Sequence, residues 1–339
     1  MSSPSTRCVA TAEQAAIELL TLRDCLRWAV SRFGQAQIFT GHGTATLFDE
    51  AVALALWSLH LPPDELERWL DARLTRSEVK ALIALFESRC ESRSPAAYLT
   101  GEAWLRGICF KSDARALVPR SLIAEALDTS LPDYLHAFER PPGWPQRVLD
   151  LCTGGGSLAI HCALQFPDAS VCASDLSDAA LALAADNLAL HGLDQRVRLI
   201  CGDLLEPHLL EPHQTDQFDL IVCNPPYVCD ASMARLPAEF RAEPQVALAG
   251  GADGMDLIRR ILAQAPGCLA ENGLLLLEIG HEADHFERAF PKLEFAYLPV
   301  ETGDRMLVAI EVKALQRLSP GPAGQPPSRK RPTRRQSAA

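Results

Sequence analysis

Long apolar runs and paired cysteines are missing from this sequence of 339 residues. No apolar stretch reaches about 18 residues, the length that a membrane-spanning helix requires. The first residues also lack the apolar core of a signal peptide. Among eleven cysteines there is no CxxC pair, which disfavours a cysteine-based zinc site. We therefore expect a cytoplasmic protein with reduced thiols and no bound metal.

Acidic residues are absent from residues 314–339, which contain six Lys or Arg. The other 313 residues hold 26 basic and 43 acidic groups, a net charge of −17. An acidic body of this kind disfavours stand-alone binding of nucleic acid, because carboxylates repel phosphates. The basic segment is rich in Pro, Gly and Ser, and we expect it to be a disordered tail.

The first third of the chain has a helical pattern. Apolar residues recur at helical spacing over three stretches, residues 13–33, 47–59 and 75–86. Thr75 precedes Glu78 by three residues, as in a capping box at the start of a helix. We therefore predict a small helical domain within residues 1–97.

Residues 98–120 have a different pattern, because apolar side chains such as Tyr98, Leu99 and Phe110 are interleaved with Gly101 and Gly107. Such a pattern predicts a β-hairpin or paired extended segments. This hairpin would join the helical domain to the rest of the chain.

From residue 147 onward, short apolar strands alternate with helices. We expect strands at residues 148–151, 170–174, 197–201, 218–223 and 274–279, and two closing strands within 293–311. This order predicts a Rossmann-like α/β domain over residues 121–313, with a mostly parallel, seven-stranded sheet covered by helices on both faces.

A glycine-rich turn follows the first of these strands. It reads Asp150-Leu151-Cys152-Thr153-Gly154-Gly155-Gly156. Glycines in such a turn allow the backbone to approach a ligand closely. Asp175 ends the second strand, where a carboxylate can accept two hydrogen bonds from a ribose diol.

Two interpretations fit this turn: a dehydrogenase that binds a dinucleotide, and a methyltransferase that uses S-adenosylmethionine. In the second, Asp150 would serve the amino-acid part of the cofactor, and Asp203 would accept a hydrogen bond from its adenine amino group. Aspartate is also a common helix N-cap, which would explain Asp203 without a ligand.

The tetrapeptide Asn224-Pro225-Pro226-Tyr227 follows the apolar strand 218–223, at the end of a parallel strand where such sheets bind ligands. A planar NH2 group is a weak nucleophile, because its lone pair is delocalised. The side-chain oxygen of Asn224 and the carbonyl of Pro225 could each accept one of its N–H bonds, and Tyr227 could pack on it. Positioning of this kind favours attack on a methyl donor, and it has no use in a dehydrogenase.

Together, the Asp-x-x-Thr-Gly-x-Gly turn, Asp175 and the Asn-Pro-Pro-Tyr tetrapeptide resemble the HemK-like protein-(glutamine-N(5)) methyltransferases. The resemblance covers about residues 10–312 and includes Arg120 and Glu243. It implies that residues 152–156 bind S-adenosylmethionine and that residues 224–227 bind the substrate glutamine. One departure is Gly155, where the family usually has Ser or Thr.

Residues 26–33 and 41–44 are similar to the branch of this family that methylates large-subunit ribosomal protein L-three. That similarity implies a ribosomal protein as substrate, either free or in an assembling ribosome. The acidic body would steer such a basic partner, and the basic tail would contact RNA weakly. Three alternatives remain open: glutamine methylation of a release factor, methylation of a nucleobase amine, and a non-catalytic assembly factor.

Two histidine patterns also occur in the sequence. Residues 281–285 read His-Glu-Ala-Asp-His, the HExxH string of zinc proteases, but it follows a strand directly. We therefore interpret it as the polar first turn of a surface helix. His42 lies between two glycines, and we expect a loop histidine with a local hydrogen bond.

Overall fold

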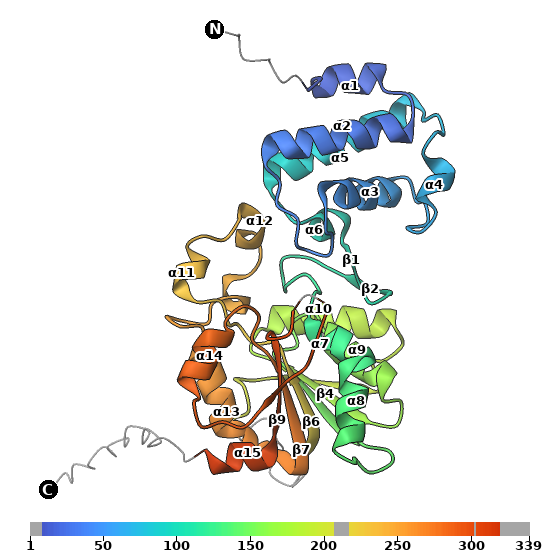
Figure 1. Ribbon diagram of the computed structural model, residues 1–339. Coiled ribbons are helices and arrows are strands. Elements are labelled where there is room, and N and C mark those ends of the chain that lie inside the picture. Colours follow the sequence, from blue (N-terminus) through green and yellow to red (C-terminus); the bar gives the residue numbers. More distant parts are fainter. Residues whose placement is uncertain (1–8, 207–216, 302, 319–339) are drawn as a thin grey trace, which may run out of the picture.

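The structure is a computed structural model that describes residues 9–206, 217–301 and 303–318 (Figure 1). Its amino-terminal part is a helical bundle with an apolar core of its own. The bundle contains α1 (Ala12–Glu18), α2 (Leu22–Ala36), α3 (Leu47–Ser58), α4 (Leu66–Trp69) and α5 (Arg76–Ser92). Phe33 and Phe86 are fully buried, and their rings meet edge to face with centroids 5.7 Å apart.

Threonine capping boxes begin four of the five bundle helices. The hydroxyl of Thr75 accepts from the backbone N–H of Glu78, and the Glu78 carboxylate accepts from the N–H of Thr75 at 2.7 Å. This confirms the predicted cap. Thr11, Thr21 and Thr46 start α1, α2 and α3 in the same way.

The prediction of one helix over residues 13–33 is wrong, because the chain breaks between α1 and α2. The residues at the break bond to residues 72–74 instead of continuing the helix. The Leu74 N–H donates to the Leu20 carbonyl at 2.9 Å, and Thr21 forms a β-bridge with Arg73. Thr21 then restarts the helix with Asp24, the polar residue that interrupts the apolar pattern.

The predicted hairpin is present but shorter than expected. Strand β1 (Glu102–Leu105) pairs antiparallel with β2 (Ile108–Lys111) across Arg106 and Gly107, which both have positive φ. A two-residue turn with this geometry matches the twist of the strands. Tyr98 and Leu99 belong instead to α6 (Ala96–Thr100), so their assignment to an extended segment is wrong.

The carboxy-terminal part is a seven-stranded sheet with the order β5-β4-β3-β6-β7-β9-β8. Its strands are β3 (Arg147–Leu151), β4 (Ser170–Asp175), β5 (Val197–Cys201), β6 (Phe218–Cys223), β7 (Leu269–Glu278), β8 (Ala296–Tyr297) and β9 (Leu307–Glu311). The first five in this spatial order are parallel, and β9 is antiparallel to both neighbours. The predicted Rossmann-like α/β fold is confirmed.

Helices cover both faces of the sheet, because successive side chains of a strand point to opposite sides. Val148 and Leu220 belong to the core beneath α7 (Leu122–Asp128), α8 (Ser130–Ala137) and α9 (Ser157–Gln165). Leu149 and Ile221 belong to the core beneath α13 (Asp256–Cys268), α14 (Ala283–Ala289) and α15 (Val312–Arg317). Helix α10 (Asp178–Leu190) packs along β5 and the hairpin.

The expectation of a disordered tail from residue 314 is wrong for its first four residues. They belong to α15, where Ala314 and Leu315 are buried against the sheet. The apolar contact with β7 outweighs the polar composition of the segment. Residues 319–339, which hold the arginine and lysine runs, lie outside the described residues.

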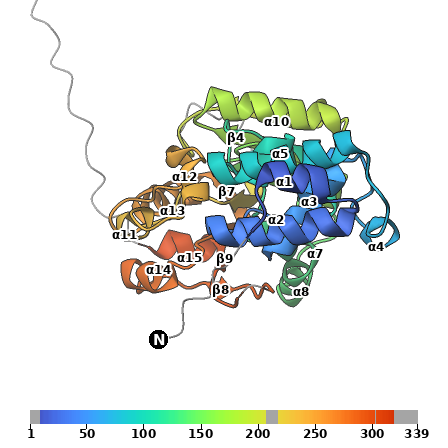
Figure 2. The same cartoon turned by 90° about the horizontal axis from the view of Figure 1, so that it is seen from above.

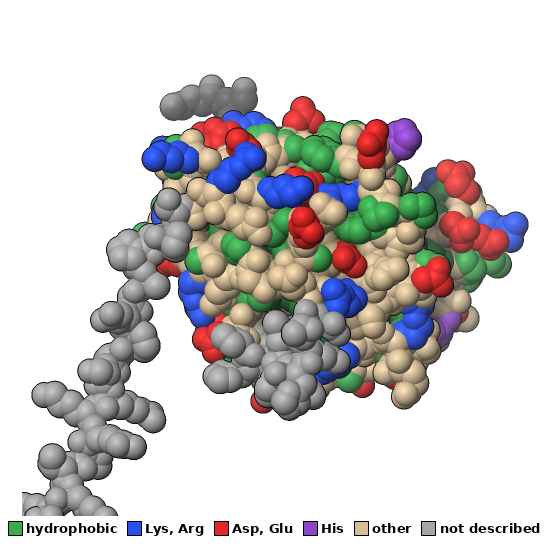
Figure 3. All heavy atoms as spheres, turned by 90° about the horizontal axis from the view of Figure 1, so that it is seen from below, with side chains coloured by type: hydrophobic (Ala, Val, Ile, Leu, Met, Phe, Trp, Pro, Cys, Tyr) green, Lys and Arg blue, Asp and Glu red, His purple; other side chains and the backbone are tan. Residues whose placement is uncertain are grey.

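The bundle lies over the sheet edge at which the parallel strands end, with α6 and the hairpin between the two parts (Figure 1). Seen from above, the bundle lies between α10 on one side and α13 to α15 on the other (Figure 2). On the opposite face of the molecule, acidic and basic side chains are interspersed with apolar ones (Figure 3). None of the described helices combines the length and apolar character needed to cross a bilayer.

The hairpin turn gives a test of the fold. Gly107 has a φ of +78° with open space where a Cβ would lie, so Gly107→Ala introduces backbone strain without a clash. We expect a loss of about 1–2 kcal/mol in the free energy of unfolding. Gly267→Ala is the matched control, because this helical glycine also has open space and an ordinary φ. It should be neutral or stabilising. Equal urea midpoints for the two variants would contradict this turn geometry.

Candidate active site

A cavity of about 910 Å³ opens at the carboxyl ends of β3, β4, β5 and β6. It is lined by residues 113–121, most of the glycine-rich turn, residues 174–177, residues 202–204, and Asn224, Pro226, Pro244 and Val246. The walls thus come from the hairpin connection, from four strand ends and from the segment after the Asn-Pro-Pro-Tyr tetrapeptide. Most predicted site residues meet at this one edge of the sheet.

The glycine-rich turn forms the floor of the cavity between β3 and α9. Cys152, Gly154 and Gly156 have positive φ values of 61°, 55° and 81°. A Cβ on Gly156 would lie 3.1 Å from the Cβ of Ala184 in α10, so the turn packs too closely for a side chain there. The Gly155 carbonyl accepts from the Asn187 amide at 2.9 Å. Helix α10 therefore holds the turn from behind.

Gly155 stands where the family usually has Ser or Thr. Its φ is ordinary, so the backbone does not require glycine here, but the packing around it favours glycine. A Cβ at this position would approach the Leu183 Cδ2 atom to 3.3 Å. That is tighter than most contacts of this kind, so in this chain a side chain at residue 155 would require Leu183 to shift.

Asp150 supports the turn from below and is fully buried. Its Oδ2 atom accepts from the Thr153 hydroxyl at 2.5 Å and from the Ala159 N–H at 2.9 Å. Its Oδ1 atom is buried without a partner among the described residues. Burial raises the pKa of Asp150 to about 7, and the two hydrogen bonds only partly oppose this.

The two other predicted acids lie at neighbouring strand ends and line the cavity. Asp175 accepts from the N–H groups of Gly154 and Ser177, each at 2.9 Å. A carboxylate oxygen can accept more than one hydrogen bond, so Asp175 can still bind a hydroxyl. Asp203 is partly exposed and accepts from Arg260 at 2.7 Å.

The tetrapeptide divides into two halves. Asn224 and Pro226 line the cavity, whereas Pro225 and Tyr227 are not among its lining residues. The Tyr227 hydroxyl donates to Glu278 at 3.2 Å, and a Cβ on Gly280 would lie 2.5 Å from the Tyr227 ring. The ring is thus held against the end of β7. The pKa of Tyr227 lies well above its ordinary value, mainly because of burial and also because of the nearby Glu278 carboxylate. The hydroxyl therefore stays protonated.

Glu243 connects the cavity wall to the helical bundle, which the sequence did not reveal. Its buried carboxylate accepts from the Val118 N–H at 3.0 Å, from Arg120 at 2.5 and 2.8 Å, and from His42 at 3.1 Å. The predicted local hydrogen bond of His42 is therefore wrong, because its partner lies 201 residues away. Burial raises the pKa of Glu243, but the hydrogen bonds from His42 and Arg120 outweigh it and hold the pKa below 4.5.

A second buried glutamate lies one helical turn earlier, in α12 (Ala238–Arg241). The Glu239 carboxylate accepts from the Phe39 N–H at 3.1 Å and from Arg93 at 2.8 Å, and it lies 3.5 Å from Arg89. Arg89 is itself fully buried and donates to Glu50 at 2.5 Å. Glu239 therefore provides a second connection between this segment and the bundle.

The HExxH string does not form a protease-type site. His281 is exposed and precedes α14, and Glu282 is the N-cap residue of that helix. Glu282 bonds to His285 at 2.5 Å. The string therefore includes the polar start of a short helix, as predicted.

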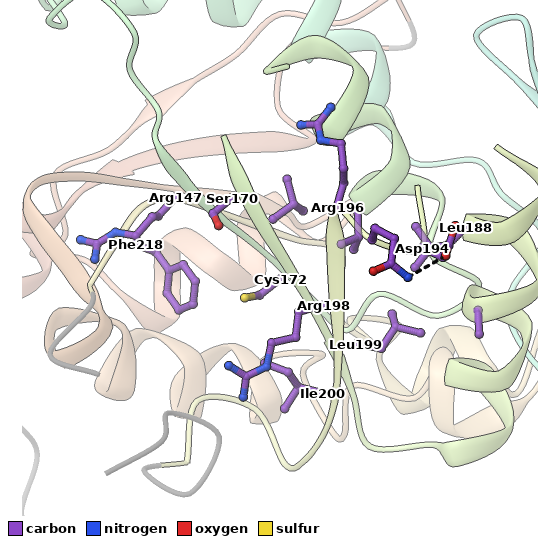
Figure 4. Close-up of a pocket in the computed structure, with 14 residues that line it drawn as sticks. Arg147, Ser170, Cys172, Leu188, Asp194, Arg196, Arg198, Leu199, Ile200 and Phe218 are labelled. Atoms are coloured by element: carbon purple, nitrogen blue, oxygen red, sulfur yellow. Dashed lines mark hydrogen bonds between the residues drawn. The ribbon is translucent and has the colours of Figure 1, made fainter. Parts of the chain in front are cut away.

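A second cavity of about 670 Å³ lies along the edge strand β5 (Figure 4). Arg196 lines it and donates to the Ala163 carbonyl at 3.1 Å. None of the predicted site residues lines this cavity. The candidate active site is therefore the cavity above the glycine-rich turn.

Comparison with known proteins supports a methyltransferase. The family model of the methyltransferase small domain matches residues 127–251. The ribosomal protein uL3 glutamine methyltransferase of Bordetella pertussis is 53% identical over 86% of this chain and 95% of its own length. The proteins of the same name from Burkholderia pseudomallei and Neisseria gonorrhoeae are 50% and 46% identical, over 87% and 86% of this chain and over 95% and 94% of their own lengths.

The ion pair between Glu243 and Arg120 gives a prediction for stability. Glu243→Gln keeps the shape but leaves the Arg120 guanidinium without its charge partner, so we expect a loss of roughly 3–5 kcal/mol in the free energy of unfolding. Glu294→Gln is the control, because its pair with Arg317 is exposed and should contribute less than about 1 kcal/mol. Because the pKa of Glu243 is lowered, its contribution is present above pH 4.5 and lost as the pH falls through the lowered value. Equal unfolding curves for both variants at pH 7 would contradict this role.

Asp150 gives a prediction of opposite sign. Because its pKa is raised from 3.8 to about 7, the folded protein binds a proton that the unfolded chain releases. The stability of the wild type should therefore fall, relative to that of Asp150→Asn, as the pH rises from 4 to 7, and then level off. Urea unfolding at several pH values measures this difference, with the exposed Asp194→Asn as control. Parallel pH profiles of wild type and Asp150→Asn would refute it.

Proposed function

The chain belongs to the family of ribosomal protein uL3 glutamine methyltransferases, and from this premise we propose that it methylates a glutamine side-chain amide of ribosomal protein uL3, with S-adenosylmethionine as the methyl donor. The observation that carries the proposal is the position of Asn224. Its side chain lies in the wall of the same cavity whose floor is the glycine-rich turn.

The residues around the cavity fit S-adenosylmethionine. A volume of about 910 Å³ lies within the range of small-molecule sites. Residues 152–156 would hold the donor along the turn, and Asp175 would accept from its ribose. Asp203 would lie near the adenine, and the unpaired oxygen of buried Asp150 would be a hydrogen-bond partner for the amino-acid part, directly or through water. When bound, S-adenosylmethionine supplies a methyl group on a positively charged sulfur.

The chain's own residues would prepare the glutamine amide for attack. The Asn224 side-chain oxygen and the Pro225 carbonyl would each accept one N–H bond of the amide, and Pro226 would limit its movement. With both hydrogens held, the nitrogen lone pair points toward the donor side of the cavity. No strong base is required, because the methylated nitrogen is acidic while cationic and releases its proton to water.

We assign Tyr227 a supporting role, whereas its sequence position suggested that it packs on the substrate amide. Its half-buried ring would support the tetrapeptide, fixed by the hydrogen bond to Glu278. Glu278 also accepts from the Ser121 hydroxyl at 2.6 Å and from the Leu122 N–H at 3.0 Å. The Glu278 carboxylate thereby links the tetrapeptide to the opposite wall of the cavity by hydrogen bonds.

The helical bundle would recognise the protein substrate, since it lies over the open edge of the sheet (Figure 1). A ribosomal protein is strongly basic, so the acidic body of this chain would attract it. The basic tail would contribute a weak contact with RNA if the substrate is an assembling ribosome. We place this reaction in the cytoplasm, where ribosomal proteins are made.

The proposal is tested by offering several substrates at once. Purified uL3, release factors, RNA and assembling ribosomal particles are incubated with isotope-labelled donor, and the products are located by mass spectrometry. We expect label on a single glutamine of uL3. Label on a release factor alone would assign the other substrate of this enzyme family, and label on RNA alone would refute a protein substrate.

Asn224→Ala should reduce methyl transfer about 10²- to 10³-fold, because it removes one of the two acceptors that position the amide. The folded state should be preserved, since Asn224 is half-buried in the cavity wall. Asn272→Ala, at an exposed position of strand β7, is the control and should retain the wild-type rate. Unchanged single-turnover rates for Asn224→Ala would overturn the catalytic assignment and favour a binding protein.

A further inference from the structure

Three side chains with metal-ligating atoms meet beside the tetrapeptide. Within the described residues, a sulfur of Cys229, a carboxylate oxygen of Glu282 and a ring nitrogen of His285 all lie within 4.8 Å of one another. They come from two segments that are far apart in the sequence. Cys229 lies two residues after Tyr227, and the other two lie at the start of α14.

We propose that Cys229, Glu282 and His285 form a binding site for Zn²⁺. Thiolate, imidazole and carboxylate are the three ligand types that zinc takes in proteins. A thiolate and an imidazole disfavour Ca²⁺ and Mg²⁺, which prefer oxygen ligands. The inference does not depend on the proposed methyl transfer.

The geometry needs only small movements to accept the ion. Zinc binds oxygen, nitrogen and sulfur at about 2.0–2.3 Å, so the ligand atoms must lie within a few ångströms of one another. Glu282 and His285 are hydrogen-bonded at 2.5 Å, and the ion would replace the proton between them. The Cys229 thiol would release its own proton to solvent on binding.

The surroundings restrict the three side chains before any ion binds. Cys229 is buried, and the Glu282 side chain is only 11% exposed. The Cys229 N–H donates to the Glu282 carboxylate at 3.4 Å, and its sulfur lies 3.4 Å from the Ser232 hydroxyl. The 33% exposure of the His285 side chain provides an access route from solvent. A fourth position would remain for water or for Ser232.

This site differs from the zinc site that the HExxH string suggests. It uses the glutamate and the second histidine of the string, whereas the exposed His281 is not a member of the group. The third ligand is a cysteine that the sequence places more than fifty residues earlier. A bound ion would connect the segment after Tyr227 to α14 and thereby stiffen the loop that carries Asn224.

The test uses cobalt as a spectroscopic substitute for zinc in the full chain. After treatment with a chelator, the protein is titrated with Co²⁺ and then with Zn²⁺. We expect one equivalent of Co²⁺ with visible bands of a four-coordinate ion and a near-ultraviolet band from a cobalt–thiolate bond, all displaced by Zn²⁺. Added Zn²⁺ should also raise the unfolding temperature, because it binds only the folded state.

Two variants and two matched controls locate the ion. Cys229→Ser should abolish the thiolate band, and Cys229→Ser and His285→Ala should each weaken Zn²⁺ binding by at least about 100-fold. Cys201→Ser removes an exposed cysteine elsewhere, and His281→Ala removes the histidine outside the group, so both should bind Zn²⁺ as the wild type does.

Circular dichroism distinguishes loss of a ligand from loss of the fold. The proposal is overturned if the folded wild type binds no stoichiometric Zn²⁺ at micromolar concentration. It is also overturned if the thiolate band survives in Cys229→Ser, or if His281→Ala weakens binding as much as His285→Ala does.

Discussion

The arrangement of the two parts depends on two carboxylates buried where they meet. Glu239 and Glu243 are both almost completely inaccessible, and their partners come from the bundle and from the connection between the hairpin and the sheet. Burying a charge is costly unless it is paired and hydrogen-bonded, and each of these groups has at least three donors around it. With Glu50 the junction holds three carboxylates, and Arg89, Arg93 and Arg120 supply three guanidinium groups.

The same junction shapes the cavity. Pro244 and Val246 line it and directly follow Glu243, while Val118 and Arg120 line the opposite wall and donate to that glutamate. Phe240, between the two glutamates, packs against the His42 ring and under the Arg120 guanidinium. The position of the bundle and the width of the cavity are consequently set by one set of contacts.

Local patterns made much of the fold predictable from the sequence. The threonine caps, the period-two strands and the glycine-rich turn all depend on residues a few positions apart, and the strands were predicted within a few residues. The site residues at strand ends were predictable for the same reason, since parallel strands bring their carboxyl ends to one edge.

The break before Thr21 was missed because its hydrogen-bond partners lie some fifty residues later. His42 was misread because Glu243 lies 201 residues away. The helical residues 314–317 of α15, of which Ala314 and Leu315 are buried, were missed because the composition of a segment does not reveal the apolar surface on which it packs.

The buried glutamates also limit which helical bundles can be joined to this α/β domain. Exposed bundle positions such as Phe48 and Trp57 make none of the junction contacts described above. A replacement bundle, by contrast, would have to present guanidinium groups to Glu239 and an imidazole to Glu243 at the same places. Otherwise Glu239 would lose its charge partners, and Glu243 would keep only Val118 and Arg120. We therefore expect a chimaera of two family members to fold when the bundle and residues 237–247 come from the same parent protein. It should fail to fold when they come from different parents.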